Sequence, residues 1–225
     1  MPRDAFGNGS VAGWRGIASD WAGEKQVFAV PWGKAMMWIF LVSDTFIFTC
    51  FLTGYMTVRI AGTVPWPDLG EMFGMSVRGH SVPLLLIAIM TFTLISSSGT
   101  MALAVNYAYR RERAKTAVLM LATAALGICF VGMQAFEWTE LIQKGVRPWA
   151  NPFGAAQFGA SFFMITGFHG LHVSAGAIYL SAVAARVLKG RYERRGNYSI
   201  VEIAGLYWHF VDLVWIFIFA LFYLW

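Results

Sequence analysis

The chain has 225 residues, of which 58% are hydrophobic and 13% are charged. Soluble globular domains carry about 25% charged residues, so this composition excludes a water-soluble domain and predicts a protein whose main solvent is lipid. The formal net charge of +5 could suggest a nucleic acid partner. However, the basic residues lie in short clusters between apolar runs, a distribution that indicates membrane topology instead, and we expect no nucleic acid partner.

Five apolar runs are each long enough to cross a bilayer as a helix. A helix rises about 1.5 Å per residue, so roughly 20 residues span a hydrocarbon core about 30 Å thick. The predicted spans cover residues 35–58, 82–109, 116–136, 153–185 and 203–225. They lack the strict alternation that is typical of β-barrel strands. The sequence therefore predicts an all-α membrane bundle of five transmembrane helices over residues 35–225, preceded by a cytoplasmic N-terminal arm over residues 1–34.

The lysines and arginines predict how the bundle is oriented. Thirteen of the 17 basic residues fall in the N-terminal arm and in the loops after the second and fourth spans. Because cytoplasmic loops carry an excess of basic residues, we expect the N-terminus in the cytoplasm. The C-terminus, with Tyr223 and Trp225, is then expected at the outer interface. The predicted location is the bacterial plasma (inner) membrane.

A few ionisable residues lie in the apolar runs or at their ends. They are Asp44, Glu137, His169, His172, His209 and Asp212. Each costs a few kcal/mol in lipid unless it faces a partner or a cavity, so each is a candidate functional residue. The alternative is that they are hydrogen-bonded contacts between helices.

Helical spacing suggests how these residues group. His169 and His172 are three residues apart and are expected to share a face. The same spacing relates His209 to Asp212 and Gln134 to Glu137. Asp44 lies at a similar depth to His209 and Asp212, so these three side chains would cluster if the first and fifth spans were neighbours.

Glycines and cysteines in the spans carry further expectations. Gly167 and Gly170 are expected to let another backbone approach closely. Cys50 and Cys129 are expected to be small packing residues.

Metal binding is the less favoured interpretation. A b-type heme between His172 and His209 would require facing helices at matching depth, and no H-x-x-x-H pair supports a copper or iron site. The buried polar residues fit proton relay or pairing with lipid headgroups better than metal binding.

The first thirty residues contain no apolar stretch of the kind found in a cleavable signal peptide.

Five segments, in order, resemble subunit III of the heme–copper terminal oxidases. They are WIFLVSDTFIF (38–48), VPLLLIAIMTFTLISSSGTMALA (82–104), MQAFEWTE (133–140), SFFMITGFHGLHV (161–173) and YWHFVDLVWIFIF (207–219). The motif residues on which the resemblance rests include Gln134, Gly167, Phe168, Gly170, Trp208, Phe210 and Trp215. The chain departs from the family at Asp44, where glutamate is usual, and at 104–106, where many relatives have a histidine pair.

The resemblance implies a short, five-helix form of this subunit that lacks the first two of seven helices. It implies an accessory subunit with no catalytic residue, metal or redox centre of its own, with heme and copper in the partner subunits. It also implies packing on oxidase subunit I, alongside subunit II and other subunits, bound phospholipid in a cleft, and support of sustained proton uptake. The alternatives are a partner of a nitric oxide reductase and a self-contained b-heme membrane cytochrome.

Overall fold

The computed structural model describes residues 31–77, 80–82, 84–190, 192 and 198–225. Five of the helices in these ranges are long and apolar enough to cross a membrane, which confirms the predicted fold class. They are α2 (Trp32–Ala61), α4 (Leu85–Tyr109), α5 (Arg113–Gln143), α6 (Ala156–Leu188) and α7 (Ser199–Phe219), the last extended by the π-helical segment η1 (Ala220–Leu224). The predicted N-terminal arm falls almost wholly outside the described residues and stays a prediction.

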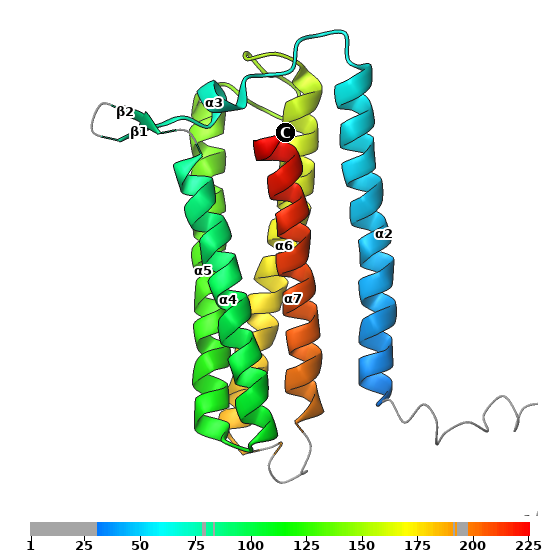
Figure 1. Ribbon diagram of the computed structural model, residues 1–225, viewed down its shortest axis with the longest axis vertical. Helices are drawn as coiled ribbons and strands as arrows, with labels where there is room; N and C mark the ends of the chain where they lie inside the picture. The colour runs from blue at the N-terminus through cyan, green and yellow to red at the C-terminus, as the bar shows by residue number, and fades with distance from the viewer. Residues whose placement is uncertain (1–30, 78–79, 83, 191, 193–197) are drawn as a thin grey trace, which may run out of the picture.

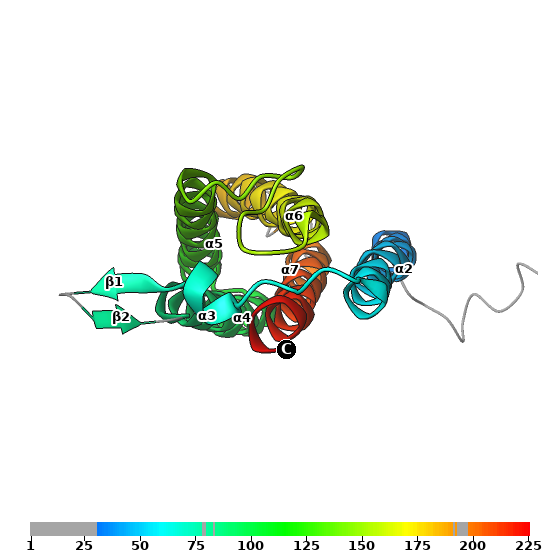
Figure 2. The same ribbon diagram turned by 90° about the horizontal axis from the view of Figure 1, so that it is seen from above.

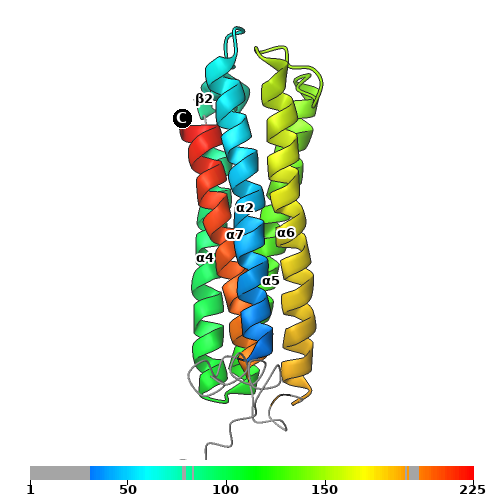
Figure 3. The same cartoon turned by 90° about the vertical axis from the view of Figure 1, so that its right-hand side faces the viewer.

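Helices α4, α5, α6 and α7 form a four-helix bundle, and α2 stands beside it (Figure 1). Viewed along the helices, α2 lies outside the closed arrangement of the other four, next to α6 and α7 (Figure 2). The view from the side places α2 across the front of these two helices (Figure 3). The first and fifth spans are therefore neighbours, which is the condition for the predicted cluster of Asp44, His209 and Asp212.

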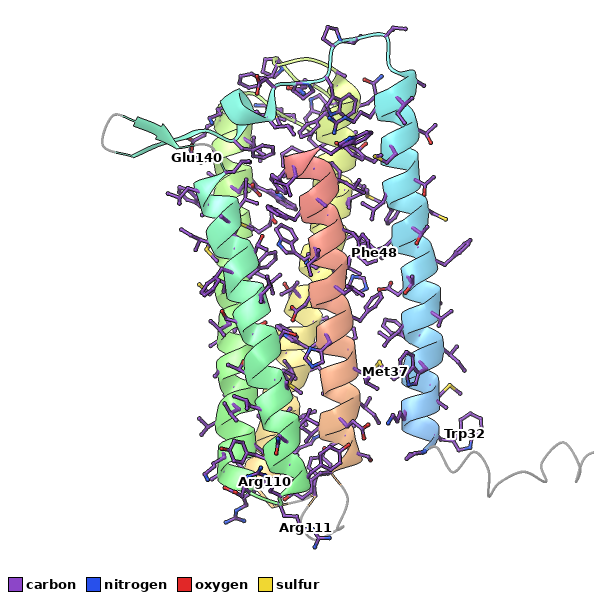
Figure 4. The ribbon with its side chains drawn as sticks, in the orientation of Figure 1. Trp32, Met37, Phe48, Arg110, Arg111 and Glu140 are labelled. Atoms are coloured by element: carbon purple, nitrogen blue, oxygen red, sulfur yellow. The ribbon has the colours of Figure 1, made fainter. Side chains whose placement is uncertain are left out.

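The two ends of the bundle differ. The turn between α4 and α5, with Arg110 and Arg111, lies at the end where α2 and α7 begin (Figure 4). The opposite end carries the short helix α3 (Leu69–Met72), a two-stranded antiparallel hairpin and Trp225 (Figure 1). In the hairpin β1 (Met75–Val77) pairs with β2 (His80–Val82). The second predicted span began at Val82, but the helix begins three residues later, after this hairpin.

Large apolar side chains cover the outside of the helices, as lipid requires. Exposed examples from four helices are Ile39, Phe46, Phe92, Ile128, Leu171 and Ile178. Cys50 and Cys129 are also exposed on this surface, so the expectation that they pack between helices was wrong. In a bilayer the outer faces are as apolar as the inner ones, so apolar neighbours do not indicate burial.

Trp208 occupies the centre of the four-helix bundle. Its indole N–H donates to Ser97 Oγ of α4 at 2.8 Å. Its ring is seated where two other helices have glycine: a Cβ atom at Gly127 of α5 would collide with it, and one at Gly176 of α6 would lie 3.0 Å away. Small residues at these positions therefore allow three helices to close around one indole.

Candidate functional site

A buried acid and a buried imidazole meet where α2 packs on α6. Asp44 Oδ2 lies 3.4 Å from His172 Nε2, and both side chains are almost fully buried. The other ring nitrogen, Nδ1, lies 2.8 Å from the carbonyl oxygen of Phe168. Since a carbonyl only accepts, Nδ1 carries a proton and Nε2 faces the carboxyl group. The pair can therefore exist as a neutral acid beside a neutral imidazole or as a carboxylate beside an imidazolium, and both forms have no net charge.

Aromatic groups enclose this pair. The rings of Phe48 and Phe168 pack against the His172 ring, with centroids 5.6 Å and 4.7 Å away. The hydroxyl of Tyr207 on α7 donates to the backbone oxygen of His172 at 2.9 Å. Phe48 points from α2 toward the bundle (Figure 4). The contact thus links α2, α6 and α7, with the buried Phe48 and the half-buried Phe168 and Tyr207 around it.

An apolar groove lies beside the pair, between α2 and α7. It has a volume of about 350 Å³. Its walls are Thr45, Phe48, Thr49, Leu52 and Thr53 of α2 and Phe210, Leu213, Val214 and Phe217 of α7. The family motif residue Phe210 is therefore a groove residue.

The predicted cluster of Asp44, His209 and Asp212 does not form. His209 Nδ1 instead meets Ser98 Oγ of α4 at 2.6 Å. Asp212 also lies beside Ser98, although its two oxygens accept no hydrogen bond of good geometry from the described residues. The physical reason is the rotation of about 100° per residue along α7, which turns Tyr207 toward α6 and α2 but turns His209 toward α4.

The two histidines of α6 face different surroundings. His169 is buried inside the bundle, stacked on Trp215 at 5.3 Å and against the edge of Phe130 at 5.8 Å. Neither of its ring nitrogens has a partner among the described side chains and backbone. His172 faces Asp44 of α2, whereas His209 faces Ser98 of α4, so the two histidines considered for a b-type heme are turned toward different helices.

Glu137, near the C-terminal end of α5, belongs to a separate group of buried polar side chains. Its Oε2 accepts from Gln134 Nε2 at 2.6 Å and from the Tyr223 hydroxyl at 3.1 Å. Tyr223 is buried, not at the interface as the sequence suggested, while Trp225 is exposed as expected. The spacing of Gln134 and Glu137 predicted their pairing correctly.

Two of the remaining motif residues, Trp215 and Gly167, contact side chains of neighbouring helices, whereas Gly170 does not. The Trp215 indole donates to Thr91 Oγ1 at 3.1 Å. A Cβ atom at Gly167 would lie 3.1 Å from the Trp138 ring, so a side chain rather than a backbone approaches there. At Gly170 a Cβ atom would meet nothing within 4 Å, so close approach of a helix does not explain this glycine.

Two contacts of α2 were missed in the sequence. Lys34 forms an ion pair with Glu202 at the start of α7. At the other end of α2, Arg59 donates to the backbone oxygen of Trp225 and its guanidinium lies 4.5 Å from the Trp225 ring centroid. The sequence could have indicated the contact between Lys34 and Glu202, because these opposite charges lie at the same membrane end of the first and last spans.

Comparison with known proteins identifies the chain's relatives. The family model described as cytochrome c oxidase subunit III matches residues 10–225. A protein named probable quinol oxidase subunit 3 from Staphylococcus saprophyticus is 31% identical over 191 residues, which cover 85% of this chain and 88% of the relative. Its namesake from Staphylococcus aureus is 32% identical over 196 residues, with the same coverage. The chain therefore belongs to the cytochrome c oxidase subunit III family of the heme–copper oxidases.

Proposed function

We propose that the chain is the accessory subunit III of a proton-pumping terminal oxidase in a bacterial plasma membrane, with its N-terminus in the cytoplasm. In this role it packs on subunit I, binds structural phospholipid and supports sustained proton uptake, while heme and copper reside in the partner subunits. The observation that carries the proposal is the Asp44–His172 pair enclosed beside the groove between α2 and α7.

The pair suits a proton-holding role because its two forms differ only in where one proton resides. Moving that proton between Oδ2 of Asp44 and Nε2 of His172 changes no net charge, and in the charged form the attraction between the two groups offsets part of the cost of removing both from water. An isolated acid in lipid lacks this freedom. The contact thus provides a protonatable group inside the membrane without a metal.

The groove suits a phospholipid chain. Its lining is apolar apart from three threonines, and the Thr45 and Thr49 hydroxyls donate to carbonyl oxygens one turn earlier in α2. No donor from these two side chains remains to attract water. An acyl chain there would fill the space between α2 and the bundle and support the position of Asp44.

Relatives named quinol oxidase favour quinol as the electron donor of the complex. The donor site belongs to the partner subunits in this proposal, so the identity of those subunits decides it.

Purification of the tagged chain from native membranes tests the proposal. We expect a large heme-bearing subunit to co-purify, and the isolated chain to show no Soret band. Removal of the chain should leave an oxidase that begins turnover at a normal rate and then loses activity. A Soret band in the isolated chain, or co-purification with a nitric oxide reductase instead of an oxidase, would contradict it.

A further inference from the structure

Glu137 lies close to the end of the bundle that carries α3, away from Asp44. One of its oxygens, Oε2, is occupied by the hydrogen bonds from Gln134 and Tyr223. The other, Oε1, is buried and has no hydrogen-bond partner among the described residues. The carboxyl group is thus held firmly by one oxygen and left unsatisfied at the other.

Oε1 requires a partner in either protonation state. As part of a carboxylate it accepts hydrogen bonds. In the neutral acid Oε1 carries the proton, because Oε2 already accepts two hydrogen bonds, and the O–H must then donate. Buried polar atoms without a protein partner are usually satisfied by ordered water.

A cavity beside Glu137 has room for that water. Its volume is about 30 Å³, and one water molecule needs roughly 10–15 Å³ of such space. The lining includes Phe73 and Gly74 near α3, Ile87 of α4, and Glu140 and Lys144 of α5. Glu140 is exposed at the end of the bundle that carries the hairpin (Figure 4). The cavity therefore lies between the buried acid and an exposed polar surface.

The segment after α3 covers this cavity. Lys144 Nζ donates to the backbone oxygens of Met72 and Gly74 at 2.9 Å and 3.2 Å. Between them, the Phe73 ring packs on the Tyr223 ring with centroids 4.8 Å apart. Lys144 thus holds this covering segment, Met72 to Gly74, against Tyr223, the tyrosine that hydrogen-bonds Glu137.

We propose that Glu137 is a water-binding, proton-exchanging site of this subunit, distinct from Asp44. One or two water molecules occupy the cavity, hydrogen-bond to Oε1, and exchange the proton of the acid with bulk water beside Glu140 and Lys144. The ligand is water or its protonated form. This role does not depend on the function proposed for Asp44.

Infrared difference spectroscopy of the purified complex in H₂O and D₂O tests this site. Spectra of wild type minus Glu137→Gln isolate the carboxyl bands of residue 137 as pH is varied. We expect a carboxylic acid band that disappears at high pH and shifts promptly in D₂O while the complex stays folded. A carboxyl group whose bands neither respond to pH nor shift in D₂O would overturn the proposal.

Three further variants separate the site from a general structural effect. Tyr223→Phe keeps the acid and removes one hydrogen bond to Oε2, so its band should move to higher frequency and still exchange. This variant tests the site even if Glu137→Gln fails to assemble, because a band that does not move refutes the geometry. Glu112→Gln, at the opposite end of the bundle and outside this cavity, is the matched control and should leave the band unchanged. Lys144→Met removes the bonds to the covering segment and should accelerate exchange.

Discussion

At the scale of single residues, Asp44 is the acid that faces His172 where α2 packs on α6. Its carboxyl oxygen stops 3.4 Å from His172 Nε2, whereas a charge-assisted hydrogen bond of this kind is usually about 2.7–2.9 Å long. A glutamate, which the resemblance gives as the usual residue here, has one more methylene group and a longer reach. The pair is therefore in contact without a strong hydrogen bond.

A protonated Asp44 inside the membrane should react with a hydrophobic carbodiimide. We expect Asp44→Asn to abolish labelling of the peptide that contains residue 44 and to make the complex lose activity faster during turnover. Asp44→Glu is the matched control and should retain both labelling and sustained turnover. The measurement is mass spectrometry of the labelled peptides together with progress curves of oxygen consumption. Unchanged turnover in Asp44→Asn would show that the acid only connects helices.

At the scale of helices, α2 makes polar contacts with the bundle at three heights, in addition to the aromatic packing of Phe48 and Tyr55. Lys34 pairs with Glu202 at one end, Asp44 meets His172 near the middle, and Arg59 reaches the end of η1. The groove interrupts apolar packing between α2 and α7. These polar contacts therefore fix the position of a helix whose other faces look toward lipid.

The ion pair between Lys34 and Glu202 should restrain the first turns of α2. We expect Lys34→Met to increase amide hydrogen exchange in the first turns of α2. The cost in stability should be small, because the pair is partly exposed to solvent. Lys115→Met is the matched control, since Lys115 pairs with Glu112 only three residues away at 2.6 Å. Equal exchange in both variants would rule out a positioning role for Lys34.

The seating of Trp208 predicts a contrast between two glycines of α5. Gly127→Ala places a methyl group into the indole ring, and overpacking of this kind costs roughly 1–3 kcal/mol. Gly132→Ala on the same helix meets nothing within 4 Å and should change stability little. Thermal inactivation of the detergent-solubilised complex measures both. A Gly127→Ala complex as stable as wild type would show that the bundle can shift to accept the methyl group.

At the scale of the whole molecule, a closed four-helix bundle carries one helix at its side. This arrangement leaves the groove between α2 and α7 along the side of the bundle. The five spans also place the start of α2 and the end of η1 at opposite ends of the bundle (Figure 1).

A bulky side chain in the groove should displace the proposed lipid. We expect Thr49→Trp to reduce the phospholipid retained by the purified complex and to shorten sustained turnover. Thr57→Trp, on an exposed part of α2 outside the groove, should do neither. Native mass spectrometry counts the bound lipid. Equal lipid content in the two variants would argue against a lipid site in this groove.

Much of the architecture could be predicted from the sequence. The number and approximate limits of the spans followed from apolar runs, because the cost of placing polar groups in lipid is local and nearly additive along the chain. Helical spacing also predicted the pairing of Gln134 with Glu137, since both residues lie on one helix.

Only the tertiary structure decided which faces of the helices meet. Asp44 pairs with His172 rather than with His209 and Asp212, Tyr223 is buried, and Cys50 faces outward. In water, hydrophobic periodicity would have indicated the inner face of each helix. In lipid the outer face is equally apolar, so that signal is lost, and the sites at Asp44 and Glu137 depend on how the helices pack.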